Sequence, residues 1–249
     1  MSLYKTRVRN LYTPKSPDLF RLSRGKLEMF LECPRCFYLD RRLGVPRPDM
    51  PGFSLNIAVD ALLKKEFDIH RAAHTAHPLM KAYKINAVPF AHEKMDDWRD
   101  SLHKGIEYHF PRTNLLITGG VDDIWQNNKH ELIVVDYKAT ATDKEITLDG
   151  EYKQAYKRQM EIYQWLLRQN GFKVADVGYF VFVNGQADRE AFDGKLEFDV
   201  TLLPHRGDDS WVAGAVRGAY KCLNGASVPK SNWDCKYCSY VKAVNVHCK

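Results

Sequence analysis

Two aspartates and a lysine in the middle of the chain have the types and spacing that metal-dependent hydrolysis needs. Asp122 lies in GGVDDIW, and Asp136 and Lys138 lie two residues apart in VVDYKAT. Both segments are rich in β-branched and aromatic residues and are separated by the polar residues 127–129, a pattern typical of two strands joined by a loop. Side chains alternate along a strand, so Asp136 and Lys138 face one side and Tyr137 faces the other. If the two strands pair as a hairpin, Asp122 reaches the same side as Asp136.

These three side chains suit a site for a divalent cation. Two close carboxylates repel each other, and a cation between them keeps both ionised. Magnesium prefers carboxylate oxygens and keeps several waters, one of which can attack a phosphodiester once the ion has lowered its pKa. Lys138 would orient or deprotonate that water, or stabilise the transition state. The competing interpretation is structural, because Asp favours turns and an Asp-x-Lys pair by itself is common.

A predicted helix over residues 152–170 strengthens the catalytic interpretation. It places Gln159 and Tyr163 four residues apart, on one face of the helix. Alone, this pair would indicate only an amphipathic helix with a tyrosine in the core. The chain contains, in this order, a Gly-x-x-Asp motif that starts at Gly119, an Asp-x-Lys motif and a Gln-x-x-x-Tyr motif. This series of motifs resembles that of the RecB-like branch of the PD-(D/E)XK nucleases. The resemblance extends to the CRISPR-associated iron–sulfur exonucleases of that branch.

The resemblance implies a role for each motif residue. In the family, the third motif lies near the metal site and contacts DNA. The expected catalytic residues are Asp122, Asp136 and Lys138. The expected substrate-binding residues are Gln159 and Tyr163. The expected ligands for Mg²⁺ or Mn²⁺ are Asp122, Asp136, Tyr137 and Asp60.

Asp60 marks a departure from the family pattern. Many RecB-like nucleases carry a metal-binding histidine on the second helix, and Asp60 in SLNIAVDALLKKEF aligns with it. An aspartate also binds magnesium, so the site survives with an altered ligand set or has lost activity. His70 lies ten residues further on and is a weak substitute, because a lone histidine there is more often a surface residue.

Two Cys-x-x-Cys pairs predict a second metal centre. Cys33 and Cys36 lie near the start, and Cys235 and Cys238 lie near the end. Four thiolates bind zinc or an iron–sulfur cluster. The resemblance favours a [4Fe–4S] cluster that joins the terminal helical segments, with zinc as the alternative. Family members commonly use one N-terminal and three C-terminal cysteines, which would replace Cys36 by Cys248.

We favour Cys36 over Cys248, because Cys248 lies next to the end of the chain, where order is poor. His247 is a further candidate ligand, and Cys222 is expected to be an ordinary buried thiol. The alternative is that these cysteines bind no metal: Cys36 is then a thiol in the core, and the cysteines of the C-terminal tail are free. Either way, we expect the centre to be structural rather than catalytic.

The order of the predicted elements indicates an α/β protein with a restriction-endonuclease-like core, in which helices flank a small mixed sheet. We expect one helix from Ser23, as N-cap, to Gly44, a second over residues 55–67, and a helical insertion or lid within 70–113. Four strands follow over 115–125, 131–139, 174–183 and 195–203, with a helix around 209–223. We predict a single domain over 1–249, with an N-terminal helical part (22–113), a catalytic sheet core (114–204) and a C-terminal helix with a Cys-rich tail (205–249).

The bulk composition permits DNA as the partner. Lys and Arg exceed Asp and Glu by 37 to 31, a modest positive balance that suits a polyanion without requiring one. No apolar leader or membrane-length run is visible, so we expect a cytoplasmic protein that does not contact a membrane.

The leading hypothesis is a Mg²⁺- or Mn²⁺-dependent deoxyribonuclease, expected to be an exonuclease, that works in DNA repair or beside a helicase or CRISPR protein. The alternative is a catalytically weakened module that binds DNA or a partner and keeps the metal clasp.

Overall fold

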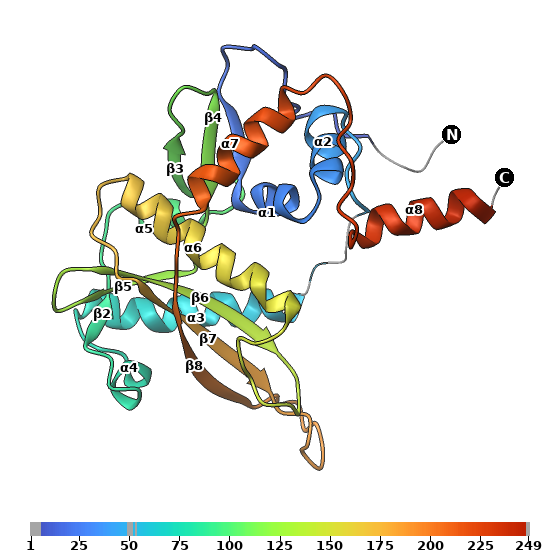
Figure 1. Ribbon diagram of the computed structural model, residues 1–249. Helices are drawn as coiled ribbons and strands as arrows, with labels where there is room; N and C mark the ends of the chain where they lie inside the picture. The colour runs from blue at the N-terminus through green and yellow to red at the C-terminus, as the bar shows by residue number, and fades with distance from the viewer. Residues whose placement is uncertain (1–5, 49–51, 53, 248–249) are drawn as a thin grey trace. The chain divides into compact units, whose positions relative to one another are not determined.

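The computed structural model describes residues 6–48, 52 and 54–247 (Figure 1). The described chain forms two compact units, which we treat separately. The first unit contains residues 6–48, 107–118 and 210–247, and the second contains residues 52, 54–106 and 119–209. Across these ranges no helix is long and apolar enough to cross a membrane.

The first unit is built from a small sheet and helices. Its strands have the order β1-β4-β3, with β1 parallel to β4. The strands are β1 (Phe20–Ser23), β3 (Ile106–His109) and β4 (Leu115–Gly119). The helices are α1 (Arg24–Glu32), α2 (Pro34–Arg42), α7 (Val212–Leu223) and α8 (Lys236–His247).

The single helix predicted from Ser23 to Gly44 is wrong. The backbone of Cys33 is extended (φ −162°, ψ 106°), and α2 begins at Pro34. Proline has no N–H and restricts the residue before it to extended conformations, so α1 ends at Glu32. Ser23 holds the N-cap position of α1, but its side chain makes no capping hydrogen bond.

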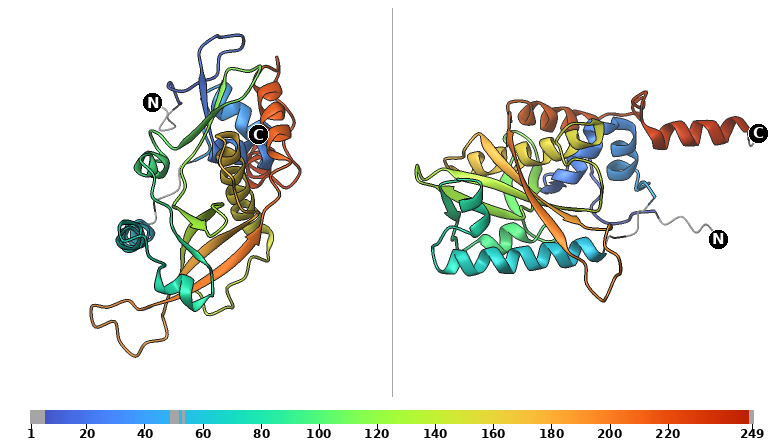
Figure 2. Two further views of the ribbon diagram at one scale, coloured as in Figure 1. Left: turned by 90° about the vertical axis from the view of Figure 1, so that its left-hand side faces the viewer. Right: turned by 90° about the horizontal axis from the view of Figure 1, so that it is seen from below.

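The second unit contains a mixed sheet between two long helices. The strand order is β2-β5-β6-β7-β8; β6 and β7 are parallel, and the other neighbours are antiparallel. The strands are β2 (Ala87–Pro89), β5 (Asp123–Asn127), β6 (Leu132–Thr140), β7 (Val177–Gly185) and β8 (Phe198–Arg206). Helices α3 (Ser54–Ala72) and α6 (Gln154–Gln169) cover opposite faces of this sheet (Figure 2). The predicted α/β class, with a mixed sheet flanked by helices, is confirmed.

Two regions differ from the sequence-based expectation. The first predicted strand is interrupted: β4 ends at Gly119 and β5 begins at Asp123, and the two strands belong to different sheets. Residues 70–113 are not a helical insertion or lid. They form α4 (Pro78–Ala82), β2, α5 (Met95–Arg99) and β3, and β2 pairs with β5 as an edge of the sheet. Edge strands of three residues are too short to leave a clear period in the sequence.

The core of the second unit lies between α3 and the sheet. Phe67 of α3 stacks on Trp125 of β5 at 5.5 Å and tilts against Tyr137 of β6 at 5.8 Å between ring centroids. All three rings are buried. This packing fixes the position of β6, the strand that carries Asp136 and Lys138 on its other face.

Candidate active site and four-cysteine centre

The β5–β6 hairpin brings the two predicted carboxylates together. Asp123 pairs with Val135, so Asp122, immediately before β5, lies across from Asp136. The backbone N–H of Tyr137 donates to Asp122 Oδ2 at 2.8 Å. On the same face as Asp136, the ammonium of Lys138 forms an ion pair with Asp136 Oδ2. The strand alternation and the hairpin predicted from the sequence are therefore both present.

Helix α6 supplies the next layer of the site. Gln159 Nε2 donates to Asp136 Oδ1 at 2.7 Å and also lies 3.1 Å from the hydroxyl oxygen of Tyr163. Gln159 and Tyr163 are both buried. The expectation that this pair binds substrate stays a prediction. What the geometry provides is a tyrosine–glutamine–aspartate chain that holds the Asp136 carboxylate in one orientation.

Gly119, the first residue of the Gly-x-x-Asp motif, leaves room for Tyr163. A Cβ at this position would lie 2.7 Å from Cε1 and 3.0 Å from Cδ1 of the Tyr163 ring, and 2.9 Å from Cδ1 of Leu166. Carbon atoms in contact prefer separations of about 3.5–4.0 Å. The absence of a side chain at Gly119 thus links the first motif of the sequence to the third.

The charges at this site favour a bound cation. Burial, and then repulsion from Asp136, raise the pKa of Asp122 to about 7. Burial lowers the pKa of Lys138, but the carboxylates of Asp136 and Asp122 outweigh that effect and hold it above its ordinary value. Lys138 is therefore an ammonium ion rather than a free base. Asp136 Oδ2 is buried and has the Lys138 ammonium as its ionic partner, so a metal ion at this oxygen would share it with Lys138.

A buried ionic network supports the hairpin from its other face. Asp123 is fully buried and accepts from Arg99 Nη2 at 3.0 Å, from the hydroxyl of Tyr137 at 3.0 Å, and from Arg71. Arg99 also donates to the backbone oxygen of Asp122 at 3.1 Å. Tyr137 therefore directs its side chain away from Asp136, and only its main chain lies beside Asp122.

Asp60 does not join the two carboxylates in this structure. Its side chain pairs with Lys64 Nζ at 2.7 Å, one turn along α3. Within the described residues, the ligand atoms of Asp60, Asp122 and Asp136 do not gather into one group. The charge of Lys64, on the same helix, also acts to lower the pKa of Asp122. His70 is hydrogen-bonded to Thr75 Oγ1 at 3.0 Å.

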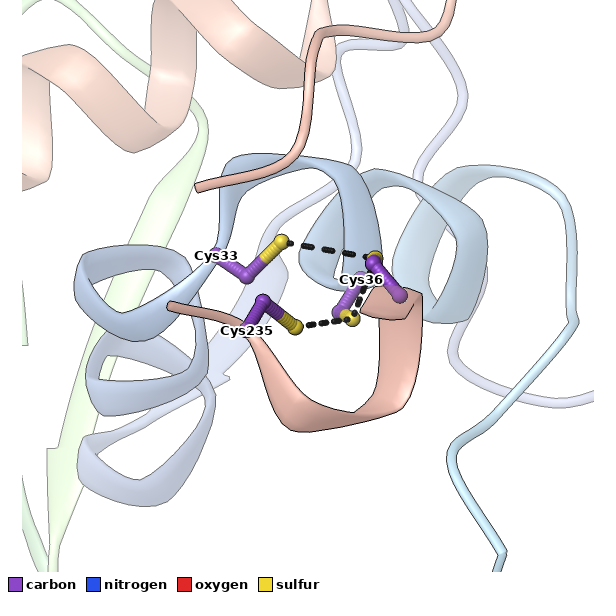
Figure 3. Close-up of side chains that lie close together, drawn as sticks. Cys33, Cys36 and Cys235 are labelled. Atoms are coloured by element: carbon purple, nitrogen blue, oxygen red, sulfur yellow. Dashed lines mark hydrogen bonds between the residues drawn. The ribbon is translucent and has the colours of Figure 1, made fainter. Parts of the chain in front are cut away.

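The two cysteine pairs converge in the first unit. The sulfur atoms of Cys33, Cys36, Cys235 and Cys238 all lie within 4.8 Å of one another. Figure 3 shows Cys33, Cys36 and Cys235 directed toward a common point from the start of α2 and the segment before α8. Cys248 lies outside the described residues. His247, at the end of α8, is exposed, and Cys222 stands apart from the group, with its sulfur 3.8 Å from the carbonyl oxygen of Pro34.

The distances between the sulfur atoms and the pKa values of their thiols are consistent with a site for a metal ion. Cys36 Sγ lies 3.6 Å from both Cys235 Sγ and Cys238 Sγ. A tetrahedral zinc ion with Zn–S bonds of about 2.3 Å requires sulfur separations of about 3.8 Å. Burial raises the pKa of Cys36 to about 11, whereas N–H groups directed at Cys33 outweigh burial and lower its pKa to about 7. As thiolates, four sulfur atoms this close would repel one another unless a cation lay between them, and the cluster provides the ligands for one.

The model of the PD-(D/E)XK nuclease superfamily matches residues 21–243. The chain belongs to the PD-(D/E)XK nuclease superfamily. Proteins of this superfamily are generally nucleases that use divalent metal ions.

Two further comparisons add little to this assignment. The crystal structure of SSO0001 is similar at 19% identity and a TM-score of 0.39, with 92% of this chain and 87% of that chain covered. That likeness is too distant to support an argument about function. No curated protein gives a significant match.

The structure of this PD-(D/E)XK protein also reveals positions that the sequence analysis did not identify. Arg71 and Arg99 lie within residues 70–113, whose sequence shows no clear period, so their ion pairs with Asp123 could not be predicted. The contact of Gly119 with Tyr163 is a tertiary one between separate motifs. The adjacent aspartates 122 and 123 were a usable signal, because on a strand they must face opposite sides.

Proposed function

We propose that this protein is a metal-dependent nuclease that hydrolyses phosphodiester bonds in DNA, of the RecB-like type. The observation that carries the proposal is the joint placement of Asp122, Asp136 and Lys138 at one end of the β5–β6 hairpin, with Gln159 bonded to Asp136. Two carboxylates and an ammonium, held together by a buried ion pair and hydrogen bonds, favour binding of a hard cation and a phosphate over a purely structural role in a turn.

Each side chain has a defined part in this proposal. A magnesium or manganese ion bound by Asp122 and Asp136 would lower the pKa of a bound water and neutralise charge on the phosphate. Lys138, protonated beside Asp136, provides a fixed positive charge for the oxygens of the scissile phosphate. Gln159 keeps Asp136 oriented through its 2.7 Å hydrogen bond, so this ligand needs no rearrangement when substrate binds.

We further propose that the four cysteines hold a metal centre with a structural role. The sulfur separations match a single tetrahedral zinc ion, whereas the iron–sulfur nucleases that the sequence resembles imply a [4Fe–4S] cluster, which would require the sulfurs to move apart. Metal analysis of anaerobically purified protein separates the two. Iron with acid-labile sulfide and broad visible absorption identifies the cluster, and stoichiometric zinc in a colourless protein identifies the ion.

A cleavage assay tests the nuclease proposal. End-labelled single- and double-stranded DNA is incubated with the metal-loaded protein in magnesium, in manganese or in EDTA, beside Asp136→Asn. We expect metal-dependent products from the wild type and a loss of at least 10²-fold in the variant, because the ligand charge is removed while the shape is kept. End-labelled products also show whether cleavage proceeds from an end, as an exonuclease requires.

A specific observation supports the second candidate, a weakened DNA-binding module: Asp60 pairs with Lys64 and does not join the other carboxylates. Asp60→His restores the residue of the family pattern, and Asp60→Ala is the matched control. If the wild type binds DNA without cutting it and Asp60→His gains cleavage, the weakened-module proposal holds. Cleavage by the wild type that vanishes in Asp136→Asn rejects it.

A further inference from the structure

Lys153 occupies an unusual position beside the proposed active site. It ends the short 3-10 turn η1 (Glu151–Lys153), just before α6 begins at Gln154. The turn follows Gly150, whose φ of +111° is one that other residues rarely adopt. Lys153 as a whole is only 9% exposed. A lysine this buried needs a reason, because desolvating an ammonium is costly.

Three aromatic rings surround the Lys153 ammonium. Its Nζ lies 4.6 Å from the ring centroid of Phe182, 5.1 Å from that of Tyr152 and 5.5 Å from that of Tyr156. These distances are within the range of cation–π attraction. No carboxylate within the described ranges lies at ion-pairing distance from Lys153. The nitrogen itself is not sealed from solvent, since it has no hydrogen-bond partner and yet is not among the fully enclosed unpaired atoms.

The same aromatic group contacts the catalytic lysine. Lys138 Nζ lies 4.7 Å from the ring centroid of Tyr156, and Lys138 pairs with Phe182 in the β6–β7 register. The two ammonium groups share the Tyr156 ring, so they are at most about 10 Å apart, given centroid distances of 4.7 and 5.5 Å. Lys138 already has a carboxylate partner in Asp136, and Lys153 has none. The Lys153 ammonium therefore adds a positive charge, held by aromatic rings, next to the site where the scissile phosphate would bind.

We propose that Lys153, with the rings of Tyr152 and Tyr156, forms a second phosphate subsite that binds the DNA phosphate adjacent to the scissile one. This inference rests on the proposed nuclease function, which supplies the polyanionic strand. In this subsite the Lys153 ammonium, next to the aromatic rings, binds a backbone phosphate. The side chain of Tyr152, which is 69% exposed, provides a ring face on which the neighbouring nucleotide base stacks. Lys153 is a substrate-binding residue in this proposal and takes no part in the chemistry at the metal.

Chemically edited DNA tests the subsite directly. A methylphosphonate linkage is neutral, and it is placed one position to the 5′ side or one position to the 3′ side of the first scissile bond. On one of these sides, we expect wild-type binding to weaken by about tenfold, as the loss of one charge-assisted contact predicts. Lys153→Met should weaken binding of unmodified DNA by a similar factor and show no further loss with the methylphosphonate. Its kcat should change by less than about twofold, because the loss is one of binding.

Two variants control the interpretation. Lys153→Arg keeps the charge and should restore binding, whereas a structural need for this lysine would not be met by charge alone. Lys157→Met removes a half-buried lysine on the next turn that contacts none of these rings, and should leave the methylphosphonate effect intact. Lys153→Met should also reduce the slope of log affinity against log salt by about 0.7, the value for one phosphate on a single strand.

The outcomes separate this inference from the proposed function. If Lys153→Met weakens unmodified and modified DNA equally, or changes neither, the subsite is refuted. If the wild type does not cut DNA, the nuclease proposal fails, and the same series is then followed by fluorescence anisotropy. In that case an unchanged methylphosphonate effect in Lys153→Met refutes the subsite, and a loss of that effect supports it. Circular dichroism and urea midpoints confirm that each variant is folded.

Discussion

The space that Gly119 leaves for Tyr163 gives a quantitative prediction. An alanine Cβ would lie 2.7 and 3.0 Å from two ring carbons of Tyr163 and 2.9 Å from Leu166, roughly 1 Å closer than carbons pack. The ring cannot easily yield, because it is 3% exposed and its hydroxyl contacts Gln159. Overpacking of this kind costs about 1–3 kcal/mol, and we expect Gly119→Ala to lie toward the upper end of that range.

A double-mutant cycle isolates the contact. In a Tyr163→Ala background most of the clash disappears, and only the flexible end of Leu166 remains near the new methyl group. Gly119→Ala should then cost less than about 1 kcal/mol, which gives a coupling energy of about 1–2 kcal/mol between the two positions. Urea unfolding of the four proteins measures each term, provided that the m-values agree.

The control is Gly25→Ala in α1, where a Cβ would meet no atom within 4 Å. This substitution should be neutral or slightly stabilising, because alanine favours helix over glycine. The reasoning would be refuted if Gly119→Ala cost the same in both backgrounds to within about 0.5 kcal/mol. The loss would then arise from the backbone at Gly119 and not from the Tyr163 ring.

Three further predictions follow from buried groups. Asp123→Asn removes the buried carboxylate that pairs with Arg71 and Arg99 and leaves them the more exposed Asp68, so urea unfolding should show a loss of about 3 kcal/mol; a change below about 1 kcal/mol would contradict the network. Burial lowers the pKa of His77, so the unfolded chain gains a proton below pH 6.5 that the folded chain does not, and stability falls as pH decreases. His77→Gln should therefore lose less stability than the wild type between pH 7 and pH 5, and equal losses would be inconsistent with a neutral buried histidine. Cys36→Ser should abolish stoichiometric metal at the four-cysteine centre and lower the melting temperature, as metal analysis and calorimetry can show, whereas unchanged metal content would remove Cys36 from the ligand set.

Most of the geometry of the proposed active site could be predicted from the sequence because that geometry is local. Alternation along β6 determines that Asp136 and Lys138 share a face, and a hairpin needs only a short loop to bring Asp122 across. The period of α6 likewise placed Gln159 and Tyr163 on one face. Each of these relations spans few residues, so each could be inferred from spacing alone.

The features that could not be predicted from the sequence depend on contacts between distant segments of the chain. That β4 and β5 belong to different sheets is a tertiary outcome, and the run LLITGGVDDIW contains no proline to signal it. Pro34 marks the break at Cys33 in the sequence, but the helical pattern on both sides of it favours one continuous helix. The aromatic surroundings of Lys153 combine a turn, a helix and a strand, and no sequence period links them.

The distance along the chain between the two cysteine pairs has a consequence for biosynthesis. Cys36 and Cys235 are 199 residues apart, so their sulfur atoms can meet only after nearly all of this sequence has left the ribosome. Chain entropy for a loop of this length opposes closure by about 5 kcal/mol, and a metal ion joined to all four thiolates would have to overcome it. Loading of the centre would then report that synthesis has passed Cys238. A chain that stopped before Cys235 would keep an unfilled pair of thiols, and chains made under metal shortage would leave the two cysteine-containing segments accessible to proteases.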